Sequence, residues 1–285
     1  GKHEPITLRH GRGTPGGFEI PGTATIGRAA LAGVRGDLCR PEVRNVSEWK
    51  LFSKIGEAGV SWEEPGYGWT PKFCREVDMT KERPKFLERA TPGALPLVEG
   101  RMVQAHRFGV KGHVSGTGRR ALWEAYAIGD SRLAPQFWIR PSDMPSANQH
   151  RADVLRVGFC DIAGQTNERS LMASLIPAGV VCGNKVPTIL FPEDPSEERL
   201  LVWVSIANSF AFDWMLRRVL TTTVNYFLLQ SVPMPKLAKD GLPWKRLVSA
   251  ARELRTLDSA GATRETYERM AQLRGEIDAE VAVAY

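Results

Sequence analysis

The residues of this chain whose types and spacing could do chemistry are mainly cations set among glycines. Residues 110–120 read VKGHVSGTGRR and contain three glycines together with Lys111, Arg119 and Arg120. Glycine lets a backbone approach a ligand closely, and basic side chains neutralise phosphate charge. We therefore predict a basic surface loop that contacts the phosphate backbone of a nucleic acid. The alternative is a surface loop whose charges are only solvated.

Two further arginines flank a polar loop. Arg140 and Arg151 lie on either side of the segment PSDMPSANQH. Phosphate contacts come mostly from such basic side chains, and they position a protein on DNA without reading sequence. Both arginines are therefore included among the predicted DNA contacts.

No motif in the sequence supplies a recognisable catalytic site. There is no G-x-S-x-G elbow, Walker loop or H-E-x-x-H pair, and the five histidines lie apart from obvious acidic partners. Residues 11–16 match G-x-G-x-x-G, but a dinucleotide fingerprint needs a strand before it and a helix at its end, and Pro15, Gly17 and Pro21 crowd that helix. We therefore predict no catalytic residue and no metal ligands. A nuclease with a dispersed acidic cluster stays open as an alternative.

Composition and charge place the chain among ordinary globular proteins. Of its 285 residues, 42% are hydrophobic and 25% charged, and the net charge of +6 is compatible with a polyanionic partner. No apolar run is long enough for a membrane span, and the first residues do not resemble a signal peptide. The four cysteines are isolated, as in reduced cytosolic proteins, so we expect a cytoplasmic location.

The segment Asp153–Pro192 is the organising part of the chain. Leu155, Val157 and Phe159 alternate with other residues and predict a strand. A short helix should follow, capped by Thr166 or Asn167. Its apolar face would consist of Leu171, Met172, Leu175 and Ile176.

Two more strands are expected before this segment ends. They are Val180–Cys182 and Val186–Phe191, separated by a turn at Gly183-Asn184 in which Asn184 would adopt a positive φ.

Strands are expected before this segment, and helices with one more strand after it. The predicted strands are Lys72–Asp78, Pro96–Phe108, Gln136–Ile139 and Val224–Val232. Ser196 should cap a helix whose apolar face reaches Trp214, and two C-terminal helices should pair around Gly261, the second capped by Thr263. The pattern predicts an α/β (α+β) fold, in which a mixed sheet is followed by a helical segment.

An ordered series of short motifs resembles the region that follows the catalytic domain in large adenine-N6 DNA methyltransferases of restriction–modification and phage-defence systems. The pieces are Arg75-Glu76-Val77-Asp78-Met79-Thr80, residues 96–103 (PLVEGRMV), Asp161-Ile162-Ala163, Thr166-Asn167-Glu168-Arg169, Ile176-Pro177, Gly179-Val180, Gly183-Asn184, Ala207-Asn208-Ser209-Phe210, Asn225-Tyr226-Phe227 and Val232-Pro233-Met234-Pro235. The resemblance covers roughly residues 69 to 285. The chain departs from the family pattern at Ala105 and Cys160, where an Asp and an Arg are frequent.

The resemblance implies a target-recognition domain that clamps double-stranded DNA and reads its sequence. It implies a loop-rich connection over residues 1–68, the recognition domain over 69–240 and a helical pair over 241–285. Arg169, Lys185 and Asn225 lie in or beside the matched motifs and join the predicted DNA contacts. For Asn167 and Arg169, capping and local hydrogen bonding are an alternative explanation.

The catalytic part of such an enzyme is missing from the sequence. There is no (N/D/S)-P-P-(Y/F) motif and no strand–GxG–helix unit for S-adenosylmethionine. The resemblance implies that this cofactor belongs to the parent enzyme, whose catalytic domain would be a partner in cis or in trans. A protein-interaction module that docks a methyltransferase or nuclease subunit is the alternative function.

Overall fold

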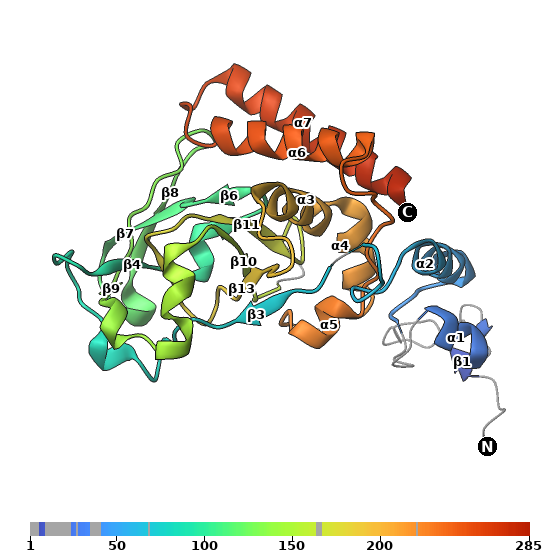
Figure 1. The fold of residues 1–285 in the computed structure, drawn as a ribbon, viewed down its shortest axis with the longest axis horizontal. Helices are drawn as coiled ribbons and strands as arrows, with labels where there is room; N and C mark the ends of the chain where they lie inside the picture. The colour runs from blue at the N-terminus through green and yellow to red at the C-terminus, as the bar shows by residue number, and fades with distance from the viewer. Residues whose placement is uncertain are drawn as a thin grey trace, which may run out of the picture.

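The structure, a computed structural model, shows several small sheets followed by C-terminal helices (Figure 1). It describes residues 6–8, 24–26, 28–34, 41–67, 69–163, 167–220 and 222–285. Residues 11–16, with their glycine motif, and Thr166, one of the two predicted helix caps, lie outside these ranges. The predicted mixed α/β fold is confirmed.

An antiparallel sheet of four strands occupies the middle of the protein. Its order is β11 (Met172–Ile176), β10 (Arg156–Cys160), β13 (Thr188–Leu190) and β3 (Lys72–Cys74). All five residues of β10 pair with β11, and the pairing joins Arg156 to Ile176 and Cys160 to Met172. Every residue of β10 is buried, so both faces of this strand are covered.

In the described ranges, the other strands form a smaller mixed sheet and three antiparallel pairs. In the mixed sheet, β4 (Leu95–Val98) pairs in parallel with β12 (Val181–Cys182) and antiparallel with β9 (Trp138–Ile139). The antiparallel pairs are β1 (Ile6–Leu8) with β2 (Ala24–Ile26), β5 (Val103–Gln104) with β6 (Arg107–Phe108), and β7 (Lys111–Ser115) with β8 (Leu122–Ala125). Residues 110–120 are thus a strand and a tight turn, and the prediction of a loop there was wrong for the first half.

The predicted helix after β10 is wrong, because Met172, Leu175 and Ile176 belong to β11 and Leu171 directly precedes it. Leu171 and Ile176 are fully buried and Leu175 is almost so, with Ala173 between them also buried. A strand covered on both faces has apolar residues at consecutive positions, and such a run also satisfies helical spacing. Pairing with β10 decides between the two.

Three other local predictions also need correction. The predicted strand Pro96–Phe108 is divided into the end of β4, a 3-10 turn and the β5–β6 hairpin. Among the described residues, only His106 and Asp240 have a positive φ without being glycine, so Asn184 forms its turn with an ordinary backbone. The predicted strand Val224–Val232 contains the short helix α5 (Tyr226–Gln230). The aromatic and leucine residues of this segment suit a strand as well as a helix. The segment is so short that its length does not distinguish the two.

The main helices begin where the capping residues predict. Ser196 accepts a hydrogen bond from the Arg199 amide at the start of α3 (Glu197–Asn208), and Thr263 caps α7 (Arg264–Ala284) in the same way. The helix after Ser196 is interrupted at Ser209, which caps a separate helix α4 (Phe210–Arg217). α6 (Leu242–Leu257) and α7 lie side by side in opposite directions over α3, as Figure 1 shows. The predicted helical pair is confirmed.

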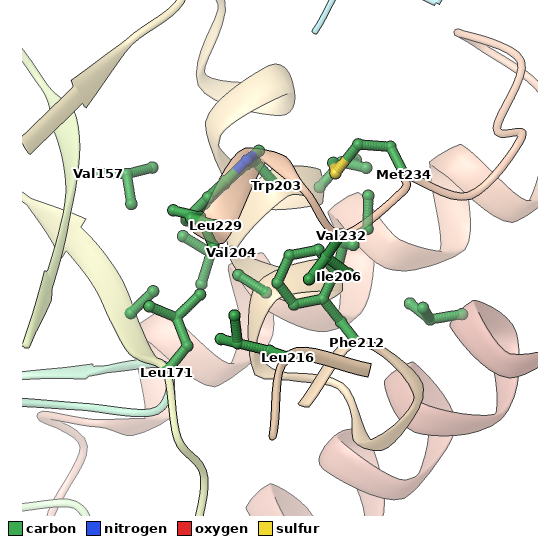
Figure 2. Close-up of a cluster of buried hydrophobic side chains, with 14 of the residues drawn as sticks. Val157, Leu171, Trp203, Val204, Ile206, Phe212, Leu216, Leu229, Val232 and Met234 are labelled. Carbon is green, nitrogen blue, oxygen red and sulfur yellow. The ribbon is translucent and has the colours of Figure 1, made fainter. Parts of the chain in front are cut away.

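One large apolar core lies where these helices meet the central sheet. Trp203, Val204 and Ile206 of α3 point into it, together with Phe212 and Leu216 of α4 (Figure 2). α1 (Arg28–Val34) and α2 (Val46–Ala58) contribute to the same core, and so do α6 and α7. None of the helices in the described ranges is long and apolar enough to cross a lipid bilayer.

Candidate nucleic-acid interface

A cleft of about 560 Å³ opens beside the central sheet. The lining comes from the 3-10 turn before β5, the β5–β6 hairpin, the start of β7, the end of β10, the loop before β11, the turn after β12, and Arg274 of α7. Among the described residues that line it, two are acidic, Glu99 and Glu168, and six are basic: Arg101, Arg107, Lys111, Arg169, Lys185 and Arg274. Because cations outnumber carboxylates here, this cleft is the best candidate for a polyanion site among the described residues.

Two of these cations are committed to internal contacts. The Arg107 Nε lies 2.5 Å from the Asp258 carboxylate, and its Nη2 donates to the Ala127 carbonyl. The Arg169 guanidinium donates to the Asn208 carbonyl at 2.9 Å and lies 3.6 Å from the centre of the Phe210 ring. Both side chains are nearly buried, so they hold the wall of the cleft together.

The other four cations present more of their charge to solvent. Lys185 is half-exposed and lies 3.6 Å from the Asp161 carboxylate. Arg101 is also half-exposed and stacks over the Trp123 ring at 4.7 Å. Lys111 is partly buried on β7, and Arg274 on α7 donates to Glu168. These side chains are the ones that a phosphate backbone laid across the cleft would contact.

Three of the eight predicted DNA contacts therefore meet in one cleft: Lys111, Arg169 and Lys185. Arg120 is exposed at the turn of the β7–β8 hairpin, and Arg140 is exposed beside a 3-10 turn. The side chain of Arg119 lies outside the described part of the chain.

Arg151 and Asn225 have local structural settings. Arg151 is buried and donates to the Thr188 hydroxyl and to the Lys72 carbonyl, so it ties a 3-10 segment to the central sheet. Asn225 precedes α5 at the capping position, but its side chain makes no capping bond. For Arg169 the alternative of local hydrogen bonding holds only for the bond to the Glu168 carbonyl, because its other partners, Asn208 and Asp278, lie far away in the sequence.

Arg101 and Arg274 were missed by the predictions from sequence. Arg101 lies inside the matched segment 96–103, so its motif was a usable signal. Arg274 is one of several charged residues on a long amphipathic helix, and nothing in its neighbourhood distinguishes it. The packing of α7 against α3 and α4 brings it to the cleft, where it contacts Glu168 in the loop before β11.

A carboxylate lies among the cations of the cleft. Burial raises the pKa of the Glu99 carboxyl, while the nearby charges of Arg101 and His113 act in the opposite direction. Its Oε1 is buried and has no hydrogen-bond partner among the described residues. Glu99 therefore keeps one carboxylate oxygen buried, and its other oxygen lies 3.8 Å from the Arg101 guanidinium.

The cysteine of the cleft is not set up as a nucleophile. Burial raises the pKa of the Cys160 thiol, and a thiol of raised pKa carries little thiolate. Within the described ranges, no three His, Cys, Asp or Glu side chains gather into a metal-binding group. The arrangement suits electrostatic binding.

No protein-family model matches this chain, and no curated protein matches it in sequence.

Proposed function

We propose that this chain binds double-stranded DNA as the target-recognition part of an adenine-N6 DNA methyltransferase in restriction–modification or phage defence. The observation that carries DNA binding is the cleft, where partly exposed cations from distant parts of the chain meet. The ordered motifs between residues 75 and 235 carry the more specific assignment, because each occurs in the order expected for that family.

In this proposal the cations bind the phosphate backbone, and other polar groups recognise the bases. Arg101, Lys111, Lys185 and Arg274 neutralise phosphates, which supplies affinity and strong salt dependence. Polar side chains of the cleft contact base edges. S-adenosylmethionine binds to the catalytic domain of the parent enzyme, which joins this chain in cis or in trans in the cytoplasm.

The test is the salt dependence of binding to duplex DNA. Lys111→Gln and Lys185→Gln are combined, because both side chains line the cleft and neither leaves a buried carboxylate alone. Asp161 keeps its 2.7 Å ion pair with Arg75 when Lys185 is lost. Each lost phosphate contact lowers the slope of log K against log salt by about 0.9, so the double variant should lose about 1.8.

A matched pair of lysines provides the control. Lys54→Gln and Lys245→Gln remove the same charge from exposed positions on α2 and α6, outside the cleft lining. This variant should keep nearly the whole salt slope. Equal slopes for the two double variants would show that the cleft is not the phosphate site. Salt-insensitive association with a methyltransferase or nuclease subunit, without DNA binding, would support the protein-interaction alternative instead.

A further inference from the structure

We propose that the β7–β8 hairpin enters the major groove of DNA and that Val114 and Leu122 contact thymine methyl groups there. This inference rests on the proposed DNA binding and names the element that reads part of the target. It also accounts for the exposure of these two apolar side chains, which phosphate binding by the cations does not explain.

The hairpin is a separate two-stranded ribbon with a well-held base. β7 and β8 pair with each other, and among the described residues neither pairs with a third strand. The His113 amide donates to the Ala134 carbonyl at 2.8 Å, so the ribbon is tied to the segment before β9. An antiparallel ribbon of this kind fits the width of the major groove.

The turn of the hairpin is also held in place. The Gly116 carbonyl accepts a hydrogen bond from Gln136 Nε2 at 3.1 Å and lies 2.8 Å from His113 Nε2. Gly116 and Gly118 both have positive φ, which a glycine adopts without strain. A turn fixed in this way can hold side chains against base edges at little entropic cost on binding.

The outer part of the ribbon exposes two large apolar side chains. Val114 is 59% exposed and Leu122 is 62% exposed, although strand residues of this type usually pack. The strand register shifts between His113 and Ser115, so Val114 occupies an irregular position in β7. Bulges of this kind re-aim side chains near binding sites. The apolar group that a major groove offers is the C5 methyl of thymine.

Cations around the ribbon identify DNA as the occupant. Lys111 begins β7, Arg120 stands at the turn, and Arg101 covers the ring of Trp123 in β8. Lys111 and Arg101 also line the cleft, so the ribbon and the proposed phosphate site form one surface. The major groove of DNA exposes thymine methyl groups at its base and phosphates along both sides. Two apolar side chains bordered by positive charge are complementary to such a surface.

The experiment replaces thymine by uracil, which pairs identically but lacks the methyl group. Tight-binding duplexes are enriched from a random pool, and one is synthesised with either dT or dU. The variants are Val114→Ser with Leu122→Asn, and a matched control, Val46→Ser with Leu51→Asn, at similarly exposed apolar positions of α2. Thermal melting checks that all proteins fold alike.

The wild type should bind the dT duplex more tightly, by about fourfold for each methyl group buried. The hairpin variant should lose this preference and bind both duplexes as the wild type binds the dU duplex, and the α2 control should retain it. Equal binding of the two duplexes by the wild type would overturn the inference, and so would an unchanged preference in the hairpin variant. Either result leaves salt-dependent DNA binding intact. A wild type that binds no DNA at all overturns the proposed function as well.

Discussion

The guanidinium of Arg156 and the carboxylate of Glu76 form a two-point ion pair in which neither side chain is exposed. The Nε–Oε1 distance is 2.5 Å and the Nη2–Oε2 distance is 2.9 Å. Glu76 also accepts from the Cys182 amide, and Arg156 donates to the Val180 carbonyl. The pair therefore links β10 of the central sheet to the segment that carries β12 of the mixed sheet.

Breaking this pair from one side should destabilise the protein strongly. Arg156→Met leaves the Glu76 carboxylate buried without its partner, which costs about 3–5 kcal/mol of unfolding free energy. Urea denaturation followed by circular dichroism measures the loss. The double variant Glu76→Gln with Arg156→Met should recover part of it, because the uncompensated charge is gone. Arg246→Met breaks a solvent-exposed pair with Glu280 and should cost at most about 1 kcal/mol. Similar losses for the two single variants would contradict this view of the buried pair.

The protein should lose stability in mild acid because of His106. Burial lowers the pKa of this imidazole to about 3, and the charges of Arg274 and Arg169 act in the same direction. The unfolded chain takes up the proton near pH 6.5, so acid favours unfolding as the pH falls from about 6.5 towards 3. His106→Asn removes this effect and keeps the positive φ of the position, which asparagine tolerates.

Urea midpoints at pH 7 and pH 4.5 test the role of His106. Relative to the wild type, the urea midpoint of the variant should be higher at pH 4.5 than it is at pH 7. A constant difference at both values would mean that His106 titrates alike in the folded and unfolded chains.

Two aromatic residues at the junction of α2 and α4 should differ in their importance. Phe52 is 2% exposed and its ring lies 6.4 Å from that of Trp214, which is only partly buried. Phe52→Ala should cost about 3–5 kcal/mol, as for a fully buried aromatic. Trp214→Ala should cost about 2 kcal/mol, because less of its surface leaves water. Chemical denaturation of both variants checks the order, and a larger loss for Trp214→Ala would reverse our assignment of the packing.

The isolated chain should not transfer methyl groups. Its sequence lacks the motifs that hold S-adenosylmethionine and a flipped adenine in the family that it resembles. Incubation with labelled S-adenosylmethionine and mixed-sequence DNA should leave the DNA unlabelled, with an active adenine methyltransferase as the positive control. Robust labelling by the purified chain would end the proposal that it is only the recognition part.

Local sequence patterns determined the helix starts and the C-terminal pair. Ser196 and Thr263 each satisfy amides of the helix that follows, and this bond depends only on residues three positions apart. The apolar stripes of α6 and α7 likewise repeat every three or four residues, so they predict a helical pair before any partner is known. The broad α+β class follows from the order of such segments.

Tertiary structure alone decided β11 and the membership of the cleft. The run around Met172 fits a helix or a strand, and only pairing with β10 selects the strand. The sequence does not distinguish the roles of Arg151, Arg169 and Lys185. In the structure the two arginines are buried and donate to internal carbonyl and hydroxyl groups, whereas Lys185 is half-exposed. Whether a cation is free to meet a phosphate depends on its distant neighbours, and these are set by packing between segments far apart in the chain.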